Sequence, residues 1–148
     1  MNRRKTAARL LLSLFVGVIG AGEVLGQSRT PETTMHRRVS RDTETRISTA
    51  ARYRAQSNGQ CTVSFVPVLE LVTPPKHGTV RFVTTDVGVP RGSGCNNSVN
   101  GQAVMYRPDP GFVGKDQFTY NSPTDPMAFD VVGPPGLKTV FVTVVDKN

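Results

Sequence analysis

The stretch Gly101 to Tyr120, GQAVMYRPDPGFVGKDQFTY, decides the fold of this chain. Val104 and Tyr106 alternate with other residues before its turn, and Phe118 and Tyr120 alternate with polar residues after it. Alternation with a period of two is typical of a strand that buries one face. The segment between these runs is rich in proline, glycine and aspartate, which favour turns. The sequence therefore predicts two strands joined by a short connection.

Extended segments separated by turn residues continue on both sides of this stretch, from Cys61 to the end of the chain. Thr79–Thr84 is a predicted strand with Val80 and Phe82 on one face, and Lys138–Asp146 is the most β-branched one. The first extended region, Cys61–Val72, is expected to split at its proline, because proline cannot donate to a sheet ladder. No helical period competes after residue 60. The predicted class is all-β, most simply a sandwich of two sheets.

Residues 1–26 are typical of a secretory signal peptide. Basic residues precede the apolar run Leu10–Ile19, and small residues follow it. Cleavage is expected after Gly26 or after Ala21, and the product is expected to be periplasmic or secreted. An uncleaved membrane anchor is the alternative, although the run is short for a bilayer. No later segment approaches a transmembrane length.

Residues 27–60 are expected to form a flexible basic arm, with the domain boundary near residue 60. They contain few large apolar residues and so cannot offset the entropy of ordering them. The net charge of the whole chain is +7, but residues 61–148 contain seven basic and seven acidic residues. The basic character therefore gives little reason to expect a specific nucleic-acid partner. The arm is either a solvated linker or a weak tether to an anionic polymer. Its arginines are Arg29, Arg37, Arg38, Arg41, Arg46, Arg52 and Arg54.

Cys61 and Cys95 are the only cysteines. In an exported chain of this size they predict one disulfide, which would close a loop of about 35 residues and stabilise the fold by roughly 3–4 kcal/mol. A metal-binding or reactive thiol pair is less favoured, because there is no CxxC motif and no spaced histidine set.

Three motifs resemble the bacterial cadherin-like, immunoglobulin-like repeat domains. They are Pro75-Lys76-His77-Gly78-Thr79-Val80, Tyr106-Arg107-Pro108, and the corner that runs from Gly111 to Tyr120. The resemblance covers most of residues 61–148. It implies an extracytoplasmic β-sandwich that serves as a structural, adhesive or ligand-presenting module.

The corner also makes physical sense on its own residues, which are Gly111, Phe112, Gly114, Asp116, Phe118 and Tyr120. The glycines can adopt positive φ, Phe112 can close the end of the sandwich, and Asp116 can accept hydrogen bonds from turn amides. Asp109 and Asp116 could instead bind calcium. Turn capping is favoured, because calcium requires more oxygen ligands than two separated aspartates provide. No cofactor is expected.

Two long connections, Thr85–Gly101 and Ser122–Leu137, are expected at the end of the sandwich opposite the corner. Together they form the candidate partner-binding surface. Its predicted contact residues are Arg91, Asn96, Asn97, Asp125 and Phe129. The alternative is that these loops only cover a sheet edge.

Catalysis finds little support in the sequence. His77 precedes a turn glycine, and no pair of acids is spaced locally for general acid and base chemistry. We therefore expect an exported, non-enzymatic binding or structural module, with an envelope protein or polysaccharide as its partner. The alternatives are a small hydrolase or metal-dependent enzyme whose site forms only in three dimensions, and a tether that acts through the arginines.

Overall fold

The computed structural model describes residues 32–123 and 130–146. In these residues the chain forms nine strands and no helix. The strands are β1 (Glu32–Ser40), β2 (Thr45–Ala55), β3 (Cys61–Phe65), β4 (Glu70–Thr73), β5 (Gly78–Val87), β6 (Val99–Pro108), β7 (Gly114–Ser122), β8 (Asp130–Val132) and β9 (Gly136–Val145). The all-β class is confirmed, as is a break in the first extended region around Pro67.

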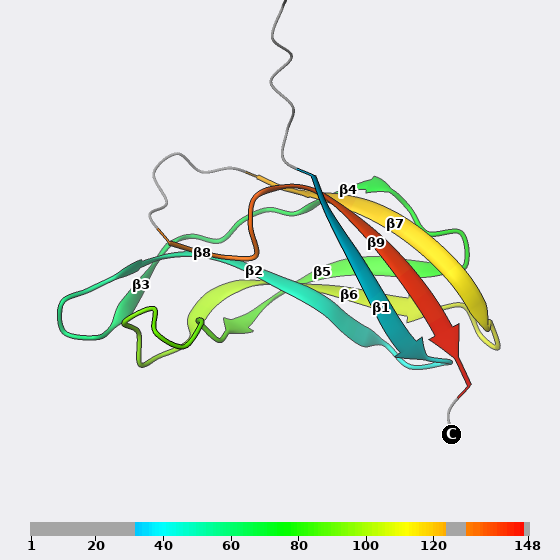
Figure 1. Cartoon of the computed structure of the whole chain (residues 1–148), viewed down its shortest axis with the longest axis horizontal. Coiled ribbons are helices and arrows are strands. Elements are labelled where there is room, and N and C mark those ends of the chain that lie inside the picture. Colours follow the sequence, from blue (N-terminus) through cyan, green and yellow to red (C-terminus); the bar gives the residue numbers. More distant parts are fainter. Residues whose placement is uncertain (1–31, 124–129, 147–148) are drawn as a thin grey trace, which may run out of the picture.

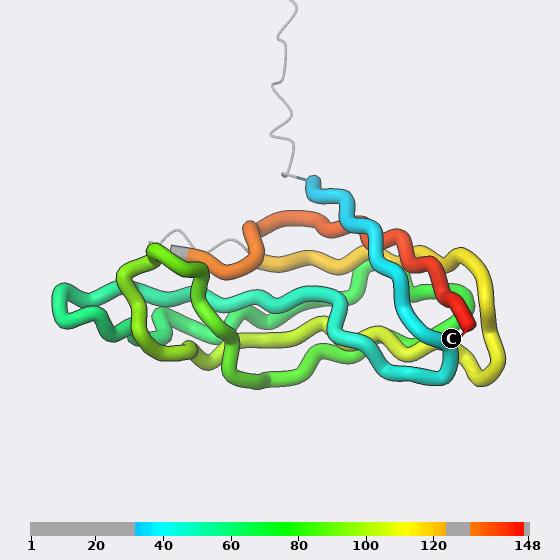
Figure 2. Tube along the Cα trace, turned by 60° about the horizontal axis from the view of Figure 1, so that its bottom comes forward, coloured from blue at the N-terminus to red at the C-terminus, as the bar shows by residue number. Residues whose placement is uncertain are grey.

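The strands form two sheets that lie one above the other (Figures 1 and 2). One sheet has four strands in the order β1-β9-β7-β4. The other follows the order β3-β2-β6-β5, with β8 paired to β2 as its fifth strand. All pairs are antiparallel except that of the first strand with the last: β1 runs parallel to β9 over its whole length, with Glu32 opposite Leu137.

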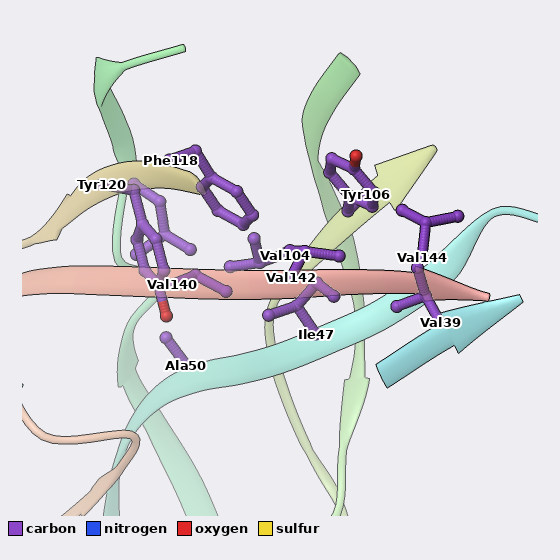
Figure 3. Close-up of a cluster of buried hydrophobic side chains, with 11 residues drawn as sticks. Val39, Ile47, Ala50, Val104, Tyr106, Phe118, Tyr120, Val140, Val142 and Val144 are labelled. Carbon is purple, nitrogen blue, oxygen red and sulfur yellow. The ribbon is translucent and has the colours of Figure 1, made fainter. Parts of the chain in front are cut away.

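The main core fills the space between the sheets (Figure 3). Val104, Tyr106 and Phe118 are fully buried there, and Tyr120 is 3% exposed. These are the inward positions that period-two alternation predicts. β9 contributes Val140, Val142 and Val144 to the same buried cluster. Burial of such side chains stabilises a fold by about 1.5–3 kcal/mol each.

The prediction of a flexible arm over residues 27–60 is wrong for its described part, and so is the boundary near residue 60. β1 is an edge strand of the four-stranded sheet, and β2 is a central strand of the other sheet that pairs with β6, β3 and β8. Val39, Ile47, Ala50 and Tyr53 are all buried. The segment is poor in large apolar residues, but in a central strand small residues pack against neighbours from distant parts of the chain. Their backbone groups are satisfied by ladder hydrogen bonds.

A second, smaller cluster lies at the end of the five-stranded sheet where the β5–β6 loop is found. It consists of Ala51, Tyr53, Cys61, Val87 and Val99, with Val89, Cys95 and Val132 packed against it. The predicted disulfide between Cys61 and Cys95 is confirmed, with the two Cα atoms 5.4 Å apart. It joins the start of β3 to the β5–β6 loop. The bridge therefore braces this cluster and does not mark the beginning of the domain.

Candidate functional site

The β5–β6 loop, residues 88–98, lies at the end predicted to bind a partner (Figure 1). Arg91 and Asn96 are exposed there. Asn97 has a structural role, because its amide copies a strand partner: its Oδ1 accepts from the Cys61 amide at 2.8 Å, and its Nδ2 donates to the Cys61 carbonyl at 3.0 Å. All three predicted contact residues on this loop are exposed, but the amide of Asn97 already binds the backbone of Cys61.

The second long connection contains Asp125 and Phe129, which lie outside the described residues. Its described ends support the shared position of the two loops, since Val132 packs in the same cluster as Val89 and Cys95. Sequence reasoning did not predict the short strand β8, which pairs with β2 and shortens this connection.

Arg52 holds the two described ends of that connection. Its side chain is fully buried, and its guanidinium donates to the carbonyls of Val132, Gly133 and Pro123 and to Ser122 Oγ, at 2.9–3.4 Å. A guanidinium presents five donors in a rigid fork, which suits it to link several carbonyl groups at once. No signal in the sequence distinguishes Arg52 from the arginines around it.

A second cation lies near Arg52. Lys138 on β9 is 2% exposed, and its Nζ donates to Thr33 Oγ1 at 3.4 Å and to the Pro135 carbonyl at 3.2 Å. Burial, with a smaller contribution from the charge of Arg52, lowers the pKa of Lys138 below its ordinary value. This end of the core is therefore polar and positively charged.

The opposite end is closed by the predicted corner, and its centre is Asp116. Oδ1 accepts from the amides of Lys76 and Gln117 at 3.0 and 2.8 Å. Oδ2 accepts from the His77 amide and the Tyr106 hydroxyl at 3.0 and 2.9 Å. The prediction that Asp116 accepts from turn amides is confirmed, but the turn that it caps is the β4–β5 turn and not that of the corner, since Gln117 lies within β7.

Two opposing effects set the pKa of Asp116. Burial raises it, but the hydrogen bonds from three amides and the Tyr106 hydroxyl outweigh burial, so the pKa lies below its ordinary value. Burial and the neighbouring Asp116 carboxylate both raise the pKa of Tyr106. Asp116 is therefore an ionised anchor whose oxygens face donors within the protein.

The other corner residues lie as predicted. Gly111 and Gly114 have φ of +77° and +149°, a region that favours glycine. Phe112 packs against the main core, and its ring stacks on His77 with 4.3 Å between ring centroids. A calcium ion at Asp116 would meet the hydrogens of four donors. In the described ranges there is no group of three or more potential metal ligands.

The surface with the most features for recognition is the outward face of the four-stranded sheet, which we call the four-stranded face. Sequence reasoning did not identify it. Its outward positions are Glu32, Thr34, His36 and Arg38 on β1; Leu137, Thr139, Phe141 and Thr143 on β9; Lys115, Gln117, Thr119 and Asn121 on β7; and Glu70 and Thr73 on β4.

The register arranges this face in rows across the strands. Lys115, Thr143 and Arg38 form the row nearest the corner, and Glu70, Asn121, Leu137 and Glu32 form the row at the other end. Between them, Phe141 and His36 stack with 5.1 Å between ring centroids. Phe141 remains 37% exposed. The face therefore has a basic end, an aromatic and threonine-rich centre, and an acidic end.

Two shallow hollows are formed by residues of this face and the β4–β5 turn. The larger, about 500 Å³, is lined by Lys76, Lys115, Gln117 and Phe141 among others. The smaller, about 440 Å³, is lined by Glu70, Leu71, Val72, Asn121 and Leu137. The larger hollow thus has a basic rim, and the smaller one contains the carboxylate of Glu70.

His77 and Asp116 also line the larger hollow, but their arrangement does not suit catalysis. The His77 ring stacks on Phe112, and Asp116 binds the His77 amide instead of its ring. A general base needs a partner that orients its ring, as the acid of a catalytic triad does. In the part of the chain that the structure describes, the rings of His36 and His77 contact phenylalanines.

The arginines assigned to the arm point in different directions. Arg37 donates to the Ile47 carbonyl at 3.0 Å, and Arg41 pairs with Asp146 at 2.8 Å. Arg52 is buried, Arg38 lies on the four-stranded face, and Arg46 is opposite Met105. Arg29 lies outside the described residues, and the arginines named here are divided between the core, an ion pair and separate strands.

Comparison of the chain with protein-family models, with curated proteins and with solved structures finds no match. Within residues 32–123 and 130–146 no helix has the length and apolar character needed to cross a membrane. The geometry of the chain itself therefore carries the functional conclusion.

Proposed function

We propose that the chain is an exported, non-enzymatic binding or structural module of the immunoglobulin-like, cadherin-like type, and that it contacts its partner through the four-stranded face. The observation that carries the proposal is the exposed Phe141–His36 stack at the centre of that face. Aromatic residues are enriched where protein surfaces meet partners. Charged rims on either side of the stack supply the polar contacts that fix orientation.

The strand order supports the immunoglobulin-like type. β4, β7 and β9 lie in one sheet, β2, β6 and β5 lie in the other, and the chain crosses between sheets at several connections. An immunoglobulin-type sandwich has its third, sixth and seventh strands in one sheet. In the proposed correspondence, β4, β7 and β9 of this chain take those three places. The Asp116 corner contains the residues of the G-F-x-G-x-D-x-F-x-Y motif, on which the resemblance rests.

Export is supported by the signal-peptide pattern and by the disulfide, because disulfides persist in oxidising compartments. The full chain should be expressed in a bacterial cell and its envelope and cytoplasmic fractions separated. We expect processing after Gly26 or Ala21, and thiols that resist alkylation until they are reduced. Unprocessed protein with free thiols in the cytoplasm would contradict export.

The binding surface can be tested with matched variants. Phe141→Thr removes the aromatic ring from the face, and Val63→Thr changes a residue of similar exposure, 39%, on β3. Immobilised protein should capture a partner from an envelope extract, and capture should be lost with Phe141→Thr alone. Arg91→Ala combined with Asn96→Ala tests the loop end. If capture depends on the loop residues and not on Phe141, the four-stranded face is not the binding surface.

A further inference from the structure

The charges of the four-stranded face are separated along the strands, and this separation indicates what the face fits. Arg38 and Lys76 are exposed at the end near the corner, and Glu32 and Glu70 are exposed at the other end. Arg38 and Glu32 both lie on β1. Lys76 follows β4, on which Glu70 lies, and its amide binds Asp116 near the basic row. Each edge of the face therefore has one cation and one anion.

We infer that the partner of the four-stranded face is a second copy of this chain, packed face to face with its strands reversed. This inference rests on the proposed function and identifies the partner. In a two-fold dimer of this kind the same patch is used by both copies. The two-fold axis must lie in the plane of the interface, either along the strands or across them.

The charges distinguish between these two axes. An axis along the strands would place the basic row on the basic row, and like charges repel. An axis across the strands places β1 over β1 with its direction reversed, so that Arg38 of one copy meets Glu32 of the other. The same operation brings Lys76 over Glu70. Because the interface is symmetric, each pairing occurs twice, which gives four ion pairs.

The centre of the face is compatible with this packing. The Phe141–His36 stack of each copy would lie over the row that contains Thr34 and Thr139 of the other, where the exposed Thr34 offers its methyl group for an apolar contact. The larger hollow, with its lysine rim, would face the smaller hollow, which contains Glu70. Long charged side chains and bridging water can occupy the space between two such hollows.

The size of the face sets the expected affinity. β1, β7 and β9 have nine or ten residues each but β4 has four, so at about 4.8 Å between strands and 3.3 Å per residue the face covers roughly 450–500 Å² per copy. About 950 Å² in total falls in the range of weak, transient interfaces. The dimer should therefore be weak, with a Kd on the order of 100 micromolar, and should be favoured where copies are concentrated on a surface.

Charge reversal provides a sharp test, read by sedimentation of the purified oxidised chain over a concentration series. One variant carries Arg38→Glu and Lys76→Glu, and the other carries Glu32→Lys and Glu70→Lys. Each variant alone places like charges opposite one another, so self-association should weaken by about tenfold or more. An equimolar mixture should form a heterodimer at least as strong as the wild-type dimer. Circular dichroism melts verify that both variants are folded.

The remaining outcomes are decisive as well. A wild-type chain that stays monomeric up to about 1 mM, ten times the expected Kd, would overturn the inference. So would a dimer that both variants leave intact, or a mixture of folded variants that fails to associate. If the wild-type chain is monomeric but Phe141→Thr still abolishes capture from the extract, the proposed function stands and the partner is another molecule. If the chain dimerises and the mixture associates, the inference holds whatever else the extract contains.

Discussion

Replacing Asp116 by asparagine should destabilise the corner more than its small change in shape suggests. Each carboxylate oxygen of Asp116 accepts two hydrogen bonds, so the amide NH2 of asparagine must face two donors in either orientation. At the Oδ2 position the Tyr106 hydroxyl can turn, because it also lies 3.2 Å from the His77 carbonyl. The His77 amide cannot turn and is left without its acceptor.

The size of this effect follows from that count. A buried donor left unsatisfied costs about 1–3 kcal/mol, and hydrogen bonds to a charged acceptor are stronger than those to a neutral one. We therefore expect Asp116→Asn to lower the free energy of unfolding by about 2–3 kcal/mol at neutral pH. Asp116→Ala leaves all four donors without the carboxylate and should lower it by about 3–5 kcal/mol. Urea denaturation of the oxidised protein measures both changes.

The pH dependence of the stability difference between wild type and Asp116→Asn is a stricter test. Because the pKa of Asp116 is lowered in the folded state, its contribution is fully present above the unfolded value of about 3.9 and is lost as the pH falls through the folded value. The gap between wild type and Asp116→Asn should be constant from about pH 7 to pH 5 and should narrow in more acidic solution. Asp109→Asn changes an exposed carboxylate of the adjacent turn and should alter stability by less than about 0.5 kcal/mol. A gap that is absent at pH 7, or that does not narrow with acid, would refute the reasoning.

Three further changes test the rest of the frame by the same denaturation assay. Arg52→Met should cost about 3–5 kcal/mol, because several carbonyls lose their buried donor, and Arg52→Lys should not restore the loss. Gly101→Ala should cost about 1–3 kcal/mol, since its new Cβ would lie 2.5 Å from the Ala50 carbonyl oxygen, whereas Gly88→Ala meets nothing within 4 Å and should be nearly neutral. Replacing both cysteines by serine should cost about 3–4 kcal/mol, and reducing agent should then have no further effect.

The strands β5, β6, β7 and β9 could be predicted because their inward residues are large and regularly spaced, whereas the three-residue β8 was not predicted. Val104, Tyr106, Phe118 and Tyr120 occupy every second position, and all four are buried. The disulfide followed from the count of cysteines. The role of Asp116 followed from its position beside turn glycines, although its main partners in the β4–β5 turn lie about 40 residues away in the sequence.

The first two strands could not be predicted from their own composition. β2 is central, but its buried residues include Ala50, Ala51 and the charged Arg52, which are not typical of an apolar stripe. Their burial depends on pairing with β6, roughly 50 residues later in the sequence. A pattern that is read over a dozen neighbouring residues does not show which distant strand a segment will pair with. β1 likewise depends on its parallel pairing with β9 at the far end of the chain.

The candidate site was only partly accessible to sequence reasoning. Asn97 was predicted to bind a partner, but an amide side chain can copy a backbone pair, and only the structure reveals that Cys61 is the residue it binds. Phe141, in contrast, left a signal. In β9 the inward positions are Val140, Val142 and Val144, so the aromatic residue between them must point outward. An exposed aromatic residue in the most β-branched strand was therefore readable before the structure.

The positions of the buried charges explain why a face, and not an end, is the surface proposed for binding. Arg52 and Lys138 are satisfied largely by carbonyl and hydroxyl groups at one end of the core, and Asp116 is satisfied by amides and a hydroxyl at the other. A buried charge that already has its hydrogen bonds gains little from a new ligand and would lose them on rearrangement. Arg38 and Glu32, at opposite ends of β1 on the four-stranded face, are exposed. Glu32 Oε1 accepts from the Thr139 hydroxyl at 3.1 Å, and a carboxylate has acceptor sites for further donors. Arg38 of another copy can therefore pair with Glu32 without displacing that bond, so the face can associate while the fold that presents it remains intact.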